Sequence, residues 1–204
     1  MYKLPYYTEH NNEVIINFMK QQSFAFVTGI GETFPVVTQL PLEVVEEGDK
    51  LFLLGHLMRN TDHHKAFEKN NKVLVIFHSP HAYINANWYS NPAQGSTVNY
   101  ISVHAKGIIQ FLEEAGTRAA VEIVTNRHIG KGTAASFENI SEEYIDTMVK
   151  AIIGFKIEVS YFENVFKLSQ NRNAEDYSNI IEQLEARANE GDIYIATKMK
   201  ERIK

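Results

Sequence analysis

Hydrophobic and polar positions alternate over several short stretches in the first half of the chain, which is typical of β-strands with one buried face. These stretches are rich in β-branched and aromatic residues, and turn signals containing Gly or Pro separate them. The alternation predicts strands over residues 23–30, 36–40, 50–56, 73–77 and 82–84, the first two as a hairpin. Residues 98–111 predict a longer strand, and residues 153–168 predict a strand or a bent pair. We therefore expect six or seven strands.

Hydrophobic residues three and four positions apart predict helices between and after these strands. The first is residues 14–19, and the others are residues 61–70, 113–127, 141–151, 173–188 and 192–203, the last two forming a helical C-terminal extension over about 173–204. Short connections between the strands favour an antiparallel barrel over a doubly wound sheet. The fold class is therefore mainly β with inserted and terminal helices. The length fits a single domain, residues 1–204.

Composition narrows the function classes. The chain has no cysteine, which excludes disulfides, cysteine-ligated metal sites and cysteine nucleophiles. Its net charge of −5 gives no support to DNA as a partner, because phosphate contacts need clustered Lys and Arg. The N-terminus lacks the apolar stretch of a signal peptide, and no stretch reaches the roughly 18 apolar residues of a membrane span. We therefore expect a cytoplasmic protein without membrane contact.

Common catalytic signatures are absent from the sequence, including the dinucleotide-binding glycine motif, the P-loop, His-Glu-x-x-His and Gly-x-Ser-x-Gly. Two histidine pairs, His63-His64 and His78 with His81, are weak metal candidates. Residues three apart on a strand point to opposite faces, and neighbours on a helix diverge by about 100°. Neither pair has a carboxylate at a matching offset, so we expect no metal site.

Two polar clusters could bind an anion. Gly55, His56, Arg59 and Asn60 lie where a predicted strand passes into a predicted helix, and free N–H groups at a helix start suit a phosphate. The alternative is a turn with an exposed arginine. Lys167, Ser169 and Arg172 follow another strand and form the second cluster, whose alternative is a solvated strand end.

Other residues could face a flat ligand. The polar side chains and backbone of Thr38-Gln39-Leu40 suit a heterocycle such as a flavin ring, although an ordinary half-buried strand would look the same. The predicted loop over residues 87–97 is long for a structureless connection, which favours a functional role. Aromatic and polar residues surround it and could wall a planar ligand, form a dimer interface or belong to the core, namely Tyr83, Trp88, Tyr89, Asn99, Tyr100 and His104.

Motifs distributed along roughly residues 1–185 match a known family. They are Gln39-Leu-Pro-Leu42, Gly55-His-Leu57 with Arg59, Ser79-Pro-His-Ala-Tyr-Ile84, Trp88-Tyr89, Asn99-Tyr100 with Val103-His104, Ala151-Ile-Ile-Gly-Phe155 and Lys167-Leu-Ser-Gln-Asn-Arg172. In these motifs the sequence resembles the PaiB family of FMN-binding split-barrel proteins, often labelled negative transcriptional regulators of protease synthesis and sporulation. Gln39 stands where the family usually has His, and Val98 where it usually has Trp.

The resemblance implies a split β-barrel of the pyridoxine-phosphate-oxidase type, as a homodimer that holds FMN at its interface. It implies a flavin-dependent oxidoreductase or flavin reductase, with Tyr100 and His104 as candidates for proton transfer and no assigned catalytic residue. The alternatives are a transcriptional regulator acting through a dimer surface, or a haem-binding barrel with His81 or His104 as axial ligand. The implied cofactor contacts are Val37, Thr38, Gln39 and Leu40 along the ring, Gly55, His56, Arg59 and Asn60 at the phosphate, and Trp88, Lys167 or Arg172 from the partner subunit.

Overall fold

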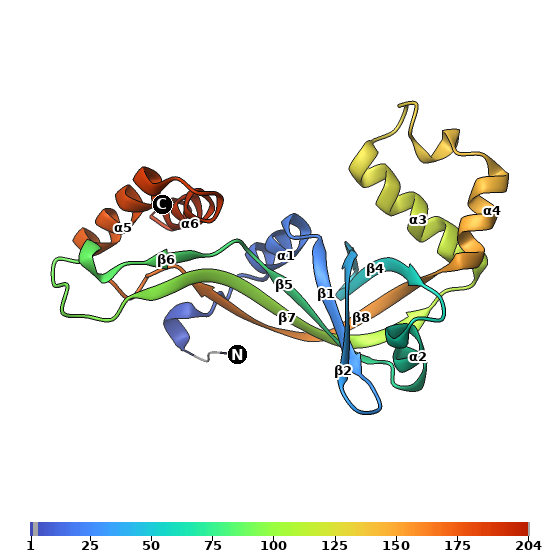
Figure 1. Cartoon of the computed structure of the whole chain (residues 1–204), viewed down its shortest axis with the longest axis horizontal. Helices are drawn as coiled ribbons and strands as arrows, with labels where there is room; N and C mark the ends of the chain where they lie inside the picture. Colours follow the sequence, from blue (N-terminus) through green and yellow to red (C-terminus); the bar gives the residue numbers. More distant parts are fainter. Residues whose placement is uncertain (2–3, 204) are drawn as a thin grey trace. The chain divides into compact units, whose positions relative to one another are not determined.

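The chain folds into two compact units. The computed structural model describes residue 1 and residues 4–203 (Figure 1). One unit, which we call the terminal unit, comprises Met1–Ile15, His78–Val103 and Glu163–Lys204. The other, the barrel unit, comprises Ile16–Phe77 and His104–Phe162. Each is described separately below, and the expectation of a single domain stays a prediction.

A curled antiparallel sheet forms the barrel unit. Its strands are β1 (Phe24–Ile30), β2 (Pro35–Pro41), β3 (Glu43–Glu47), β4 (Lys50–Met58) and β5 (Lys72–His78), together with parts of the long strands β7 (Thr97–Phe111) and β8 (Ile152–Lys167). The strand order is β2-β1-β5-β7-β8-β4-β3. Only Leu42 separates β2 from β3 along the chain, yet these strands stand at opposite ends of the order. The sheet therefore curls back on itself and stays unpaired at the seam between β2 and β3.

Alternation of side chains explains the core of this barrel. In β1, Ala25, Val27 and Gly29 are buried, and their neighbours are half-buried or exposed. The ideal Cβ position of Gly29 would lie 2.5 Å from the ring of Phe67 in helix α2 (Asp62–Lys69), so only glycine fits between strand and helix there. The period of two thus places one set of side chains inside and leaves the other set on the outer face.

Helices complete the barrel unit. Helix α1 (Asn12–Gln21) enters it, and α3 (Glu114–Ile129), the short η3 (Phe137–Asn139) and α4 (Glu142–Ala151) follow β7. A separate apolar cluster that includes Val121, Phe137 and Ile145 holds these last three helices together. Among the residues that the structure describes, no helix is both long and apolar enough to cross a bilayer.

The terminal unit contains η1 (Pro5–Tyr7), β6 (Ala82–Ile84), η2 (Ala86–Trp88), α5 (Ala174–Arg187) and α6 (Glu190–Glu201), with β6 paired to β7. Helices α5 and α6 lie side by side (Figure 1). Arg187 at the end of α5 binds the fully buried carboxylate of Asp192 in α6, with 2.6 Å between Nε and Oδ2. Its guanidinium also lies 4.9 Å from the ring centre of Trp88 in η2, so Arg187 links α5, α6 and η2 through its contacts.

Most predicted elements are confirmed, including the β1–β2 hairpin, β8 as one continuous strand and the helices from residue 173 onward. The predicted number of strands, six or seven, was too low, because the sheet contains eight within the part of the chain that the structure describes. The missed strand is β3, in which Val44 is buried and pairs with Leu53 of β4. Three of the five residues of β3 are glutamates, so its sequence does not show the alternation of hydrophobic and polar residues that predicts a strand.

Candidate functional site

Strand β2 carries the residues predicted to line a flavin ring, and it is unusually accessible. Among the strands that the structure describes, β2 pairs with β1 alone, so one of its edges has free N–H and C=O groups. Val37 is 56% exposed and Gln39 is exposed, while Thr38 and Leu40 are half-buried. The strand therefore offers both backbone hydrogen bonds and side-chain contact to a flat heterocycle.

The predicted junction between strand and helix is present at the end of β4. Arg59 is held by its backbone N–H, which donates to the carbonyl of Ala151 at 3.0 Å. Asn60 adopts a left-handed conformation with φ 63°, and its N–H donates to Nδ1 of His64 at 3.1 Å. These two hydrogen bonds fix the backbone of the turn. The side chain of Arg59 is half-buried, and its guanidinium has no carboxylate partner among the described residues.

The start of helix α2 differs from the prediction of free anion-binding N–H groups. Thr61 caps the helix, since its Oγ1 accepts from the N–H of His64 at 3.3 Å. The N–H of His63 donates to the carboxylate of Asp62 at 2.8 Å. The helix start therefore already has a negative group and occupied donors, and Arg59 is the cation that this junction offers to a phosphate.

His56 and Gly55 have distinct roles in β4. Burial lowers the pKa of His56, so its imidazole is neutral near pH 7, and its buried Nδ1 has no hydrogen-bond partner among the residues that the structure describes. An orphaned buried nitrogen fits a ligand or water that completes it. An ideal Cβ on Gly55 would lie 2.8 Å from Leu42 and 2.9 Å from Phe155, which gives this glycine a packing role.

In the terminal unit, the turn after β8 is held rigidly. Ser169 adopts φ 61°, which is rare for a residue other than glycine, and its carbonyl accepts from the N–H of Arg172 at 2.9 Å. The side chain of buried Asn99 in β7 donates to Oγ of Ser169 at 2.8 Å. Gln170 bonds the N–H of Leu168 at 2.7 Å. Side-chain bonds thus hold the strained turn and orient Lys167 and Arg172.

A polar cavity of about 280 Å³ lies beside this turn. Lys167 lines it, donates to Oγ1 of Thr97 and lies 5.8 Å from the ring centre of Tyr7. Arg172 lines it too, bonds the Gln94 side chain and lies 3.9 Å over the ring of Tyr89. None of the described residues that line this cavity is acidic, and burial lowers the pKa of Lys167. Two cations beside hydroxyl groups make a site for an anion.

The structure brings together some of the predicted contacts within each unit. Lys167 and Arg172 share the polar cavity, whereas Trp88 does not line it and instead stacks with Arg187. Sequence reasoning missed Tyr7 and Asn171, whose side chains bond each other at 3.1 Å at the cavity wall. Asn171 lies inside the Lys167–Arg172 motif and could have been included. Tyr7 lies 164 positions from Asn171 in the sequence, and no motif or periodic pattern indicated that it belongs to this site.

The histidines proposed as haem ligands lie on different elements. His81 is exposed just before β6, and the half-buried His104 lies on β7. Among the described residues there is no group of three or more His, Asp or Glu side chains that could hold a metal ion. Tyr100 is also half-buried on β7.

Comparison with known proteins places the chain in a family. Residues 1–161 match the family model described as "Putative FMN-binding domain". Over its full length the chain is 33% identical to the protease synthase and sporulation protein PAI 2 of Bacillus subtilis, covering 99% of that protein. The chain belongs to this FMN-binding family. Membership confirms the predicted resemblance and the cofactor class. Lys167 and Arg172 lie beyond the family model but within the match to the Bacillus protein.

Solved structures confirm the predicted fold of this family member. A flavocytochrome of Azotobacter vinelandii covers 87% of the chain and 78% of its own at 15% identity, with a TM-score of 0.66. An FAD- and haem-binding protein of Mycobacterium smegmatis covers 84% of the chain and 78% of its own at 14% identity, with a TM-score of 0.62. At these identities the likeness shows a shared fold, the curled antiparallel barrel with helices.

Proposed function

We propose that this chain is an FMN-dependent redox protein that acts as a homodimer. The observation that carries the proposal is the polar cavity with Lys167 and Arg172, two cations that have no acidic neighbour in its lining. Family membership supplies the identity of the anion, the phosphate of FMN. Bound FMN would supply the hydride or electron transfer, and the residues of the chain would bind and orient it.

Each residue group has a separate task in this proposal. The free edge of β2 holds the polar edge of the flavin ring by backbone hydrogen bonds, and Val37 gives apolar contact on the exposed face of the strand. Neutral His56 adds a hydrogen bond through its unpaired Nδ1. Arg59 of one subunit, with Lys167 and Arg172 of the other, would hold the phosphate.

Retention of flavin tests the proposal. Purified protein is stripped of bound ligand, supplied with FMN, passed through gel filtration and scanned for visible absorbance. We expect retained flavin at one molecule per chain, with loss of retention in an Arg172→Ala variant. The matched control is Arg118→Ala, which alters an exposed arginine paired with Glu142. A folded wild-type protein that retains no flavin would overturn the proposal.

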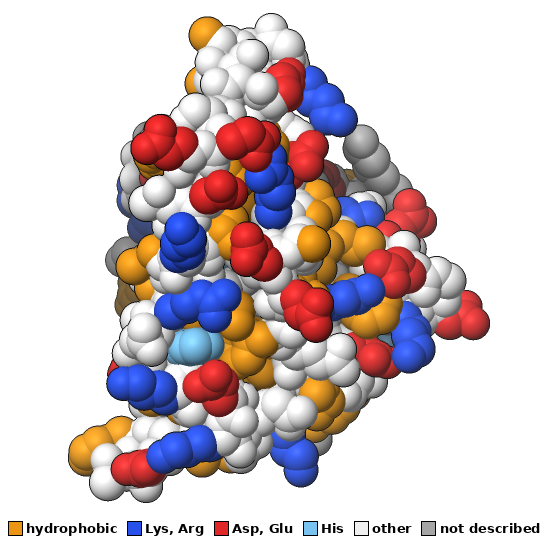
Figure 2. All heavy atoms as spheres, turned by 90° about the vertical axis from the view of Figure 1, so that its right-hand side faces the viewer, with side chains coloured by type: hydrophobic (Ala, Val, Ile, Leu, Met, Phe, Trp, Pro, Cys, Tyr) orange, Lys and Arg blue, Asp and Glu red, His pale blue; other side chains and the backbone are white. Residues whose placement is uncertain are grey.

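A regulatory role through DNA has weaker support. The Bacillus relative carries a name from protease synthesis and sporulation. Figure 2 shows Lys and Arg interspersed with Asp and Glu on the face that it draws, with no continuous basic surface there. Haem is a second alternative, favoured by the likeness to a flavocytochrome. A haem titration of His81→Ala and His104→Ala would test it by the loss of the absorbance shift that ligation causes.

A further inference from the structure

The pair His63-His64, a weak metal candidate in the sequence, lies at the start of α2, next to the turn that carries Arg59. His64 is 5% exposed, and Nδ1 of its ring accepts from the N–H of Asn60 at 3.1 Å. Asn60 adopts φ 63°, a left-handed conformation that is uncommon outside glycine. The buried imidazole therefore holds the residue that lies between Arg59 and the helix cap Thr61.

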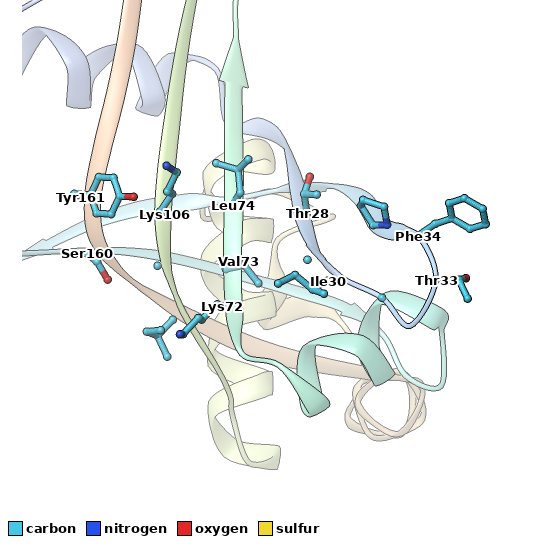
Figure 3. A pocket seen from close by; sticks show the side chains of 15 residues that line it. Thr28, Ile30, Thr33, Phe34, Lys72, Val73, Leu74, Lys106, Ser160 and Tyr161 are labelled. Atoms are coloured by element: carbon cyan, nitrogen blue, oxygen red, sulfur yellow. The ribbon is translucent and has the colours of Figure 1, made fainter. Parts of the chain in front are cut away.

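Helix α2 fixes the position of this imidazole. The helix contacts β1 and β2, and its Phe67 packs directly on Gly29. Figure 3 shows α2 beside the β1–β2 turn, and no residue of α2 lines the pocket that is drawn there. The ring of His64 meets the ring of Phe111 edge to face, with 4.9 Å between the ring centres. A ring packed in this way has little freedom to rotate, so its Nδ1 stays directed at Asn60.

The two nitrogens of the His64 ring have different surroundings. Nδ1 needs its lone pair to accept from Asn60, so a neutral ring carries its proton on Nε2. Nε2 is buried without a hydrogen-bond partner among the described residues, and the Glu68 carboxylate lies 3.7 Å from it, beyond hydrogen-bond length. A buried donor without a partner costs free energy. Since the ring gains one hydrogen bond, to the Arg59 turn, we look for its role there.

We propose that His64 is a positioning residue for the phosphate of FMN and acts through the turn that carries Arg59. The backbone at Arg59 is held on both sides, by its own N–H on the carbonyl of Ala151 and by the N–H of Asn60 on His64. Without the second bond the left-handed turn relaxes, and the guanidinium leaves the position that suits the phosphate. This inference rests on the phosphate contact proposed above for Arg59.

Two substitutions of similar shape separate the acceptor from the ring. His64→Asn and His64→Leu both remove the ring that packs on Phe111. Asn keeps an acceptor oxygen at the branch of the side chain where Nδ1 stands, and Leu has a methyl group there. We expect the affinity for FMN to fall about fivefold in His64→Leu and to stay within about twofold of wild type in His64→Asn. Riboflavin, which lacks the phosphate, should bind all three chains with similar affinity.

Hydrogen exchange at the Asn60 N–H gives a readout without flavin. This exchange should become about tenfold faster in His64→Leu and return toward the wild-type rate in His64→Asn. In an Arg59→Ala chain, adding His64→Leu should change the affinity for FMN less than about twofold, because the group that His64 positions is gone. The control His128→Leu alters an exposed histidine of α3 and should change neither the exchange nor the affinity.

Equal affinities for FMN in His64→Asn and His64→Leu would overturn the proposal, since the acceptor would then have no role. So would an equal loss of riboflavin affinity in His64→Leu, or an undiminished effect in the Arg59→Ala chain. If Arg59→Ala alone binds FMN as tightly as wild type, the proposed phosphate contact fails and this inference fails with it. Urea unfolding establishes that each variant is folded. His64→Phe, which keeps an aromatic ring against Phe111 without the acceptor, replaces a leucine variant that is not.

Discussion

Arg59 and Lys167 are both proposed to bind the phosphate of FMN, but they lie in different environments. We therefore expect their substitutions to affect FMN binding differently. Arg59 projects from a turn that backbone bonds hold, with its guanidinium half-exposed. Lys167 lies in a polar cavity where burial lowers its pKa and hydroxyl groups are its neighbours. A guanidinium keeps its charge at any physiological pH, whereas a lysine with a lowered pKa can lose its charge on the alkaline side.

Arg59→Ala should weaken FMN binding by about 2 kcal/mol, roughly thirtyfold, through loss of one charge-assisted contact to the phosphate. Quenching of flavin fluorescence in a titration measures the change. Arg118→Ala should leave the affinity unchanged, because Arg118 pairs with Glu142 in the α3–α4 region. Equal affinities for the wild type and Arg59→Ala would place the phosphate elsewhere.

The affinity for FMN should depend on pH through Lys167. The protonated amine binds the phosphate, so the affinity is full below the Lys167 pKa and falls as the pH rises through it. Because burial lowers this pKa, the fall begins at a lower pH than an ordinary lysine would give. Lys167→Arg should move the fall to higher pH. Riboflavin, which lacks the phosphate, should not show this fall, and a shared profile for both flavins would contradict the assignment.

At the scale of elements, β4 joins barrel packing to the candidate site. Gly55 lies where the end of β2 crosses β4, and an added Cβ would lie 3.2 Å from the carbonyl of Pro41 in addition to its close contacts with Leu42 and Phe155. The backbone of β4 therefore approaches the end of β2 closely at Gly55. A side chain here would push apart the strand predicted to hold the ring and the strand that leads to Arg59.

Gly55→Ala should lower the free energy of unfolding by about 1–3 kcal/mol, because the methyl group overpacks a closed contact. Urea unfolding measures this, and Gly95→Ala is the control, since its Cβ would meet nothing within 4 Å. A Gly55→Ala chain with unchanged stability but lost flavin affinity would show that Gly55 contacts the cofactor and has no packing role.

Local patterns predicted most elements but fewer of the contacts between them. The alternation in β1, β2 and β5 and the cap at Thr61 depend on neighbouring residues, so the sequence reveals them. Strand β3 was missed because three of its five residues are glutamates and because Val45 follows the buried Val44 directly, so hydrophobic and polar residues do not alternate there. The bond between Tyr7 and Asn171 joins residues 164 positions apart, and the polar cavity combines residues from the N-terminal segment, from β7 and from the turn after β8. Such sites depend on strand order, which periodicity does not encode.

At the scale of the whole molecule, the proposed homodimer makes a prediction that neither unit makes alone. Arg59 belongs to the barrel unit, and Lys167 and Arg172 belong to the terminal unit. If each phosphate is held by Arg59 of one subunit and by Arg172 of its partner, the two sites of a symmetric dimer each need both chains. A chain with Arg59→Ala and a chain with Arg172→Ala would then each form dimers with two damaged sites.

Mixing these two variants under conditions that exchange subunits should restore flavin binding. Random exchange makes half of the dimers mixed, and each mixed dimer has one intact site and one doubly damaged site, so about a quarter of all sites recover the wild-type affinity. Stoichiometric titration of the mixture with FMN measures this fraction. The double variant Arg59→Ala/Arg172→Ala mixed with wild type is the matched control, since each site of its mixed dimer then lacks one cation. If both cations act within one subunit, the first mixture recovers no binding and the control keeps about half of all sites intact, whereas sites shared between subunits leave about a quarter intact in the control. The two mixtures together therefore identify the subunit that supplies each contact.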